Sequence, residues 1–150
     1  HEHLRSWHMP VQARADLARE TTPRLLKQEL LPMEEMLRQL LTPEAAEALF
    51  TDDRKERCPL YVLTNRLQLY GAGCMLYDGV LETFATARGC DLYVLPSSVH
   101  EVLLMPVSEK FSKEELDEMI LQVNREHVSR EDILSDHVYR YSLKDRKLIC

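Results

Sequence analysis

The stretch DLYVLPSSVHEVLLMPV, residues 91–107, decides the fold class of this 150-residue chain. Its two apolar runs, Asp91–Leu95 and Glu101–Val107, are rich in aromatic and β-branched residues or leucine and predict two strands. Only the turn around Pro96, Ser97 and Ser98 separates them, whereas parallel neighbours need a connection of roughly a dozen residues or more. The stretch therefore predicts a hairpin, and the hairpin predicts an antiparallel sheet.

Upstream of the hairpin, the same alternation of strands and turns continues. Leu60–Thr64 predicts a buried strand, and Tyr70–Tyr77 predicts another, whose two glycines indicate a bulge or a close backbone approach. This glycine pair is not a phosphate-binding motif, because neither a third glycine nor a Gly-Lys-Ser/Thr sequence follows it. Val80–Arg88 predicts a helix, with Gly89 as its left-handed stop.

Downstream, Ser112–Glu115 has the pattern of a capping box and predicts the start of a second helix. Val138–Tyr141 and Leu148–Ile149 predict a closing hairpin. The predicted class is α+β: N-terminal helices, then β-β-α-β-β-α-β-β, with about five to six strands in a mainly antiparallel sheet and helices packed on one face.

The first third of the chain predicts helices. Val11–Glu20 predicts one, and Thr22 followed by Pro23 predicts the cap and first residue of the next, with leucines at helical spacing. Met33–Leu41 carries an apolar stripe, and Thr42–Phe50 predicts a short further helix. We expect residues 1–57 to form a helical segment and 58–150 the sheet domain. Because no initiator Met is present, we expect the chain to be a piece of a longer protein.

Composition excludes several classes of function. A net charge of −6 without a basic stripe argues against nucleic-acid binding. No apolar run approaches the roughly 18 residues of a membrane span. Four cysteines without a CxxC pair predict buried free thiols in a reducing compartment, which favours the cytoplasm. We expect no cofactor.

Two polar segments, Ser97–Glu101 and Ser135–Tyr139, each place a histidine beside a carboxylate at the end of a predicted strand, where functional residues concentrate. One interpretation is nucleophilic catalysis, with Ser97 or Ser98 attacking, His100 as base and Asp136 orienting it. No GxSxG elbow supports this interpretation.

A second interpretation of these segments is a metal site formed by His100, Glu101, Asp136 and His137. Adjacent strand residues point to opposite faces, and no HExxH-like spacing exists, so no metal site is predicted. The preferred interpretation is structural, because serine hydroxyls bond the backbone in turns. Glu101, His137 and Tyr139 remain candidates for a binding site.

Five strings carry a resemblance to a known family. They are LYVLTN (60–65), YGAGCMLY (70–77), LPSSVHEV (95–102), VN (123–124) and LSDHVY (134–139). Together they resemble DUF5688, an uncharacterised bacterial family found mainly in gut anaerobes, and more distantly an uncharacterised family of small proteins in bacilli. The likeness runs from about Trp7 to Tyr141. It implies a bacterial cytoplasmic protein that is longer at the N-terminus, and it supplies no activity, cofactor or catalytic residue.

The leading functional hypothesis is a non-catalytic protein-binding or regulatory module, because the sequence has no complete catalytic constellation, nucleotide motif or basic surface. The alternative is a small hydrolase or metal-dependent enzyme that uses the segments 97–101 and 135–137. Either a protein partner or self-association would use the apolar stripe of Met33, Met36, Leu37 and Leu40, although the same stripe is also typical of a core-facing helix.

Overall fold

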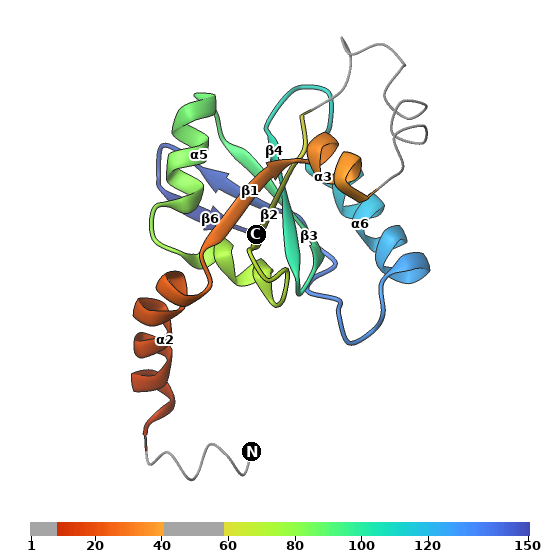
Figure 1. Cartoon of the computed structure of the whole chain (residues 1–150). Helices are drawn as coiled ribbons and strands as arrows, with labels where there is room; N and C mark the ends of the chain where they lie inside the picture. Colours follow the sequence, from red (N-terminus) through yellow and green to blue (C-terminus); the bar gives the residue numbers. More distant parts are fainter. Residues whose placement is uncertain (1–8, 41–58) are drawn as a thin grey trace.

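The computed structural model describes residues 9–40 and 59–150 and confirms the α+β class (Figure 1). In these residues, six antiparallel strands form a sheet in the order β1-β2-β4-β3-β5-β6. The strands are β1 (Gln28–Pro32), β2 (Tyr61–Asn65), β3 (Leu92–Ser98), β4 (Glu101–Pro106), β5 (Tyr139–Ser142) and β6 (Lys147–Ile149). The helices are α2 (Val11–Leu25), α3 (Met33–Leu40), η1 (a 3-10 helix, Gly71–Leu76), α5 (Val80–Arg88) and α6 (Lys113–His127). Within these ranges, no helix is both long and apolar enough to cross a membrane.

The predicted central hairpin is confirmed. Strands β3 and β4 pair antiparallel, with Leu95 opposite Leu103 and a register shift between Pro96 and Ser98. The predicted position of the turn is wrong, because β3 continues through Ser98 and the chain turns at Val99 and His100. The local helix signals hold as well. Helix α5 ends at Gly89 in the left-handed conformation, and α6 begins with the capping box at Ser112. The closing pair β5–β6 is also present. These features depend on neighbouring residues, so the sequence pattern is sufficient to predict them.

The helices cover both faces of the sheet, so the prediction of a single covered face is wrong (Figure 1). On β3, Leu92 and Val94 belong to a buried cluster that includes residues of α5. Tyr93 and Leu95, which point the other way, belong to a second cluster with residues of α6. The sheet is therefore a middle layer with a core on each side.

The predicted strand at Tyr70–Tyr77 is wrong, because most of this segment forms the 3-10 helix η1. The backbone at Gly71 packs against the end of β2 and the turn after β3. A Cβ atom there would lie 2.5 Å from the carbonyl oxygen of His100 and 2.7 Å from the backbone nitrogen of Asn65. The close approach predicted for these glycines is thus present at Gly71, but in a helical turn that buries Ala72 and Cys74.

The predicted second helix in the N-terminal segment is also wrong. Helix α2 continues through Pro23 to Leu25, and the chain then forms β1, which pairs along β2. Leu30 lies opposite Leu63 and packs against the cluster beneath α5, so tertiary pairing overrides the helical spacing of the leucines. The helix predicted at Thr42–Phe50 lies outside the described residues.

Candidate functional site

His100, the candidate base, lies in the turn between β3 and β4 and is held at both ring nitrogens. Its Nδ1 accepts a hydrogen bond from the backbone N–H of Tyr70 at 3.1 Å. Its Nε2 lies 3.4 Å from Oδ1 of Asp132. Because Nδ1 is an acceptor here, the neutral ring carries its proton on Nε2, which faces the carboxylate. His100 therefore ties two loops to the hairpin.

The two candidate serines also make bonds within this turn. Ser98 Oγ accepts a hydrogen bond from the backbone N–H of His100 at 3.0 Å. Ser97 Oγ donates to Oε1 of Glu101 at 3.3 Å. From the neighbouring strand, Thr64 Oγ1 donates to the carbonyl oxygen of His100 at 2.8 Å. These bonds stabilise the turn, as the structural interpretation expects.

The second polar segment is organised around the end of α6. Asp136 Oδ1 accepts a hydrogen bond from Nδ2 of the buried Asn124 at 2.8 Å. Ser135 Oγ accepts from the backbone N–H of His137 at 3.1 Å and from the hydroxyl of Tyr139 at 3.2 Å. The side chain of His137 is exposed. The hydrogen bonds of Ser135, Asp136 and Tyr139 therefore stabilise the chain where it enters β5.

Nearby, Asp117 of α6 anchors the start of β5. Its Oδ1 accepts a hydrogen bond from the backbone N–H of Val138 at 2.6 Å, and its Oδ2 lies 3.0 Å from Nζ of Lys113. Partial burial alone would raise the pKa of Asp117, but the Val138 bond and the Lys113 charge hold that pKa below its ordinary value. The ionised carboxylate is thus part of the folded structure.

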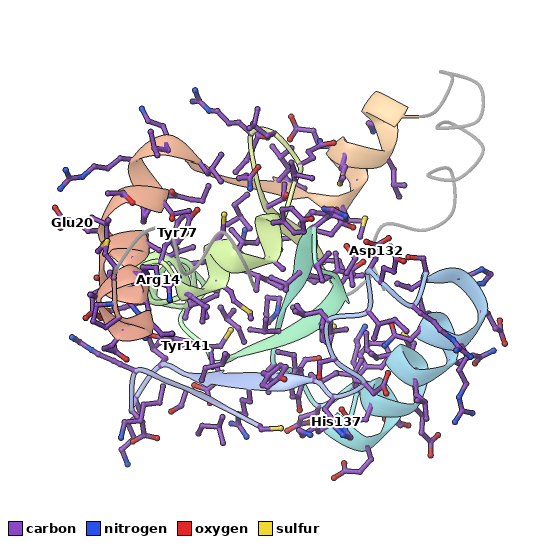
Figure 2. The ribbon with its side chains drawn as sticks, turned by 90° about the horizontal axis from the view of Figure 1, so that it is seen from below. Arg14, Glu20, Tyr77, Asp132, His137 and Tyr141 are labelled. Atoms are coloured by element: carbon purple, nitrogen blue, oxygen red, sulfur yellow. The ribbon has the colours of Figure 1, made fainter. Side chains whose placement is uncertain are left out.

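The loop before the second polar segment contacts the first polar segment, but in the described structure the residues of the candidate triad do not bond one another. The backbone N–H of Val99 donates to the carbonyl oxygen of Asp132 at 2.8 Å, which places one loop beside the other. The contacts of His100 nevertheless run to Tyr70 and Asp132, and those of Asp136 run to Asn124. Figure 2 shows Asp132 and His137 well apart. Across residues 9–40 and 59–150, no group of three or more His, Cys, Asp or Glu side chains could hold a metal ion.

Asp132, the partner of His100, is a residue that the sequence analysis missed. It lies in a turn in which Ser129 Oγ donates to its Oδ2 at 2.7 Å. The Ser-x-x-Asp spacing was a visible signal for that turn. The contact with His100 was not visible, because it depends on how two distant loops meet.

A groove between β1 and α5 is a second candidate site, and the sequence analysis missed it as well. Its volume is about 340 Å³. The strand contributes Gln28 and Leu30, and the chain before α5 contributes Asp78 and Gly79. The helix contributes Val80, Thr83, Phe84 and Ala87, whose spacing places them on one helix face. The groove is therefore mainly apolar, with polar groups near one end.

The backbone of β1 is open along this groove. The Arg66 N–H donates to the Lys27 carbonyl at 3.2 Å, and the Met33 N–H donates to the Leu60 carbonyl at 2.9 Å. Since bonding alternates along an antiparallel strand, the even-numbered residues face away from β2. Gln28 and Leu30 thus turn their N–H and C=O groups outward, and no described strand pairs with this edge.

Aromatic contacts hold the α5 wall of the groove in place. Phe84 is 8% exposed and packs edge-on against Tyr61 at a centroid distance of 4.9 Å. The guanidinium carbon of Arg88 lies 4.5 Å from the Tyr61 ring centroid and 5.2 Å from that of Phe84. A stacked cation of this kind adds roughly 0.5–1 kcal/mol at an exposed site. The α5 wall is therefore preformed.

Tyr77 fixes the start of β1 on the same side. Its hydroxyl donates a hydrogen bond to the carbonyl oxygen of Leu26 at 3.0 Å, and Figure 2 shows it beside α2. Burial, together with the neighbouring Cys74, raises the pKa of Tyr77 to about 12. A tyrosine hydroxyl is a donor at neutral pH in any case, and the raised pKa preserves the bond to the chain before β1 into the alkaline range.

The chain belongs to DUF5688, a family of unknown function, whose model matches residues 1–143. The resemblance carried by the five sequence strings is thereby confirmed. No curated protein and no solved structure gives a significant match.

Proposed function

We propose that this chain is a non-catalytic protein-binding module of the bacterial cytoplasm, and that the groove between β1 and α5 receives its partner. One observation carries the proposal: a preformed apolar groove of about 340 Å³ lies directly beside an open strand edge. Ligand sites are typically concave and mainly apolar with a few polar groups. Exposed strand edges bind extended segments of other proteins.

The side chains that line the groove support binding over catalysis. Apart from the apolar residues, they supply one amide, one hydroxyl and one carboxylate, from Gln28, Thr83 and Asp78. The alternative, a small hydrolase or metal-dependent enzyme, would use Ser97, Ser98, His100 and Asp136 in the other polar region. Their hydrogen bonds already stabilise turns, so that enzyme would have to break them to act.

Selection of peptides tests the binding proposal. A library of random displayed peptides is selected on the full chain, and the enriched peptides are measured against two variants. Thr83→Arg places a long side chain in the groove, while Thr86→Arg makes the same change at an exposed position of α5 that does not line it. We expect binding to weaken at least about 10-fold with T83R and to stay unchanged with T86R. No enrichment, or equal binding to both variants, would contradict the proposal.

Self-association through the apolar stripe of α3 is a second proposal. Met33, Met36 and Leu37 are half-buried, so this face of the helix keeps apolar surface accessible to a partner. The side chain of Leu40, the fourth residue expected in the stripe, lies outside the described part of the structure.

A further inference from the structure

We infer that the ligand of this groove is an extended segment of another protein, which pairs with β1 as an added antiparallel strand, packs alternate apolar side chains against α5 and places a basic residue beside Asp78. This inference rests on the proposed function and specifies the partner of the same site.

The backbone of β1 provides the pairing groups. Gln28 and Leu30 each offer an outward N–H and C=O, while Pro32 offers only its carbonyl. A partner strand can therefore bond at two successive positions of β1 before the proline ends the pairing. The existing sheet is antiparallel at every described pair, and antiparallel pairs are the more stable kind.

The side chains beside β1 predict an alternating pattern of apolar and polar residues in the partner strand. Leu30 points to the α5 face, since it lies opposite Leu63 and packs with the cluster on that side. In an added strand, every second side chain faces the same way and meets Val80, Thr83 and Ala87. Apolar residues at alternate positions fill this space, and polar residues suit the positions between them. The partner is thus an alternating sequence.

The position of Asp78 determines which end of the partner strand carries the basic residue. Tyr77, which precedes Asp78, donates a hydrogen bond to the chain just before β1. At the other end of α5, Arg88 stacks on Tyr61, which pairs with Pro32 at the end of β1. Helix α5 therefore runs in the same sense as β1, with Asp78 near the strand's start. Among the described residues, Asp78 forms no ion pair. An antiparallel partner then carries its basic residue near its C-terminal end.

A second copy of the chain is a poorer occupant than a basic segment. The net charge of −6 and the carboxylate of Asp78 beside the groove favour a cationic segment over a second acidic chain at this site. The preformed wall of α5 and the anchored start of β1 lower the ordering cost for a foreign strand.

The test uses a synthetic probe and the full chain. The probe is an acetylated and amidated peptide of alternating valine and threonine with a lysine near its C-terminus. Nuclear magnetic resonance follows the backbone amides while the peptide is added. We expect the amides of Gln28 and Leu30 to shift and to gain protection from hydrogen exchange. Glu29 and Leu31 already face β2 and should gain no new bond. Chemical-shift changes on α5 that are not accompanied by this alternation along β1 would overturn strand pairing.

Chemical variants of the probe provide matched controls. Methylating one peptide nitrogen that faces β1 should weaken binding about 10-fold, while methylating the next nitrogen along should change it little. Equal effects of the two methyl groups would overturn strand pairing. Moving the lysine to the N-terminal end should weaken binding, and tighter binding of that peptide would overturn the antiparallel direction.

Asp78→Asn tests the charge. It should weaken the lysine peptide about 2- to 5-fold and leave a norleucine peptide unchanged. Equal effects on the two peptides would overturn the charge contact.

These outcomes separate the inference from the proposed function. If selected peptides need an open groove at Thr83 but tolerate methylation at every nitrogen, the binding module stands and strand pairing fails. If neither selected nor designed peptides bind, both fail. Sedimentation velocity tests whether a second copy of the chain occupies the groove instead. A dimer that is dissociated by T83R but not by T86R would assign the groove to a second copy and overturn the inference.

Discussion

The backbone N–H of Tyr70 donates a hydrogen bond of 3.1 Å to Nδ1 of His100, and this bond joins the segment after β2 to the turn after β3. Tyr70 has a φ of 53°, in the left-handed region that non-glycine residues rarely adopt. The rings of the two residues also lie together, with centroids 5.5 Å apart. The histidine thus holds in place a backbone conformation that is locally unfavourable.

Replacing His100 should therefore reduce stability. His100→Ala removes the acceptor of the exposed Tyr70 N–H, which can then bond water, so we expect a loss of about 0.5–1.5 kcal/mol in the free energy of unfolding. His100→Asn, which keeps an acceptor on a short side chain, should recover part of this loss. Urea unfolding measures both variants. His137→Ala, at an exposed side chain, is the control, and an equal loss there would contradict the prediction.

The two glycines of η1 should respond differently to the same substitution. A Cβ atom at Gly71 would meet the backbone of Asn65 and His100, whereas none of the surrounding atoms lies within 4 Å of one at Gly73. We expect Gly71→Ala to cost about 2–3 kcal/mol because the packed backbone must shift. Gly73→Ala should be close to neutral. Thermal unfolding of both variants decides the matter, and similar losses would refute the packing argument.

Asp117 should contribute to acid stability. Because its pKa is lower in the folded state than its ordinary value of 3.8, its contribution is complete above that value and is lost as the pH falls through the folded pKa. Asp117→Asn should therefore be less stable than the parent at pH 7, with a smaller further loss below about pH 4. Unfolding measured from pH 7 to pH 2 tests this, with Asp78→Asn as the control. Parallel stability curves for parent and D117N would exclude the mechanism.

The stripe on α3 makes a prediction about oligomeric state. If Met33, Met36 and Leu37 mediate self-association, light scattering should show a mass that increases with concentration. Met36→Glu should then shift the chain to monomer, because burying an unpaired carboxylate in an apolar contact is costly. Glu35→Gln, at a neighbouring exposed position, is the control. A monomer at every concentration would end this proposal.

Local signals explain what the sequence could predict. The hairpin of β3 and β4, the capping box at Ser112 and the glycine stop at Gly89 each depend on a few neighbouring residues, and the structure confirms all three. The exact turn of the hairpin is different from the prediction, because Pro96, Ser97 and Ser98 belong to β3 and the chain turns at Val99 and His100. Strand β1 was missed because its leucines also fit a helical period. Only the edge of β2, which is distant in the sequence, makes the extended conformation favourable.

The apolar runs of β3 and β4 contain a signal for helices on both faces of the sheet. The runs Leu92–Leu95 and Val102–Met105 are apolar at every position, which is typical of strands buried on both sides. An alternating pattern would have indicated one covered face. The groove had no such signal, because Gln28 and Leu30 meet Val80 and Thr83 only after the sheet has assembled.

Pro32 has a consequence for solubility. An edge strand that accepts foreign segments also risks stacking copy upon copy into fibres. A proline at the end of β1 removes a donor that continuous stacking would need, and at the opposite edge β6 extends only from Lys147 to Ile149. Neither edge of the described sheet offers a long template, so a strand paired with β1 in the proposed manner would leave little edge on which further copies could stack.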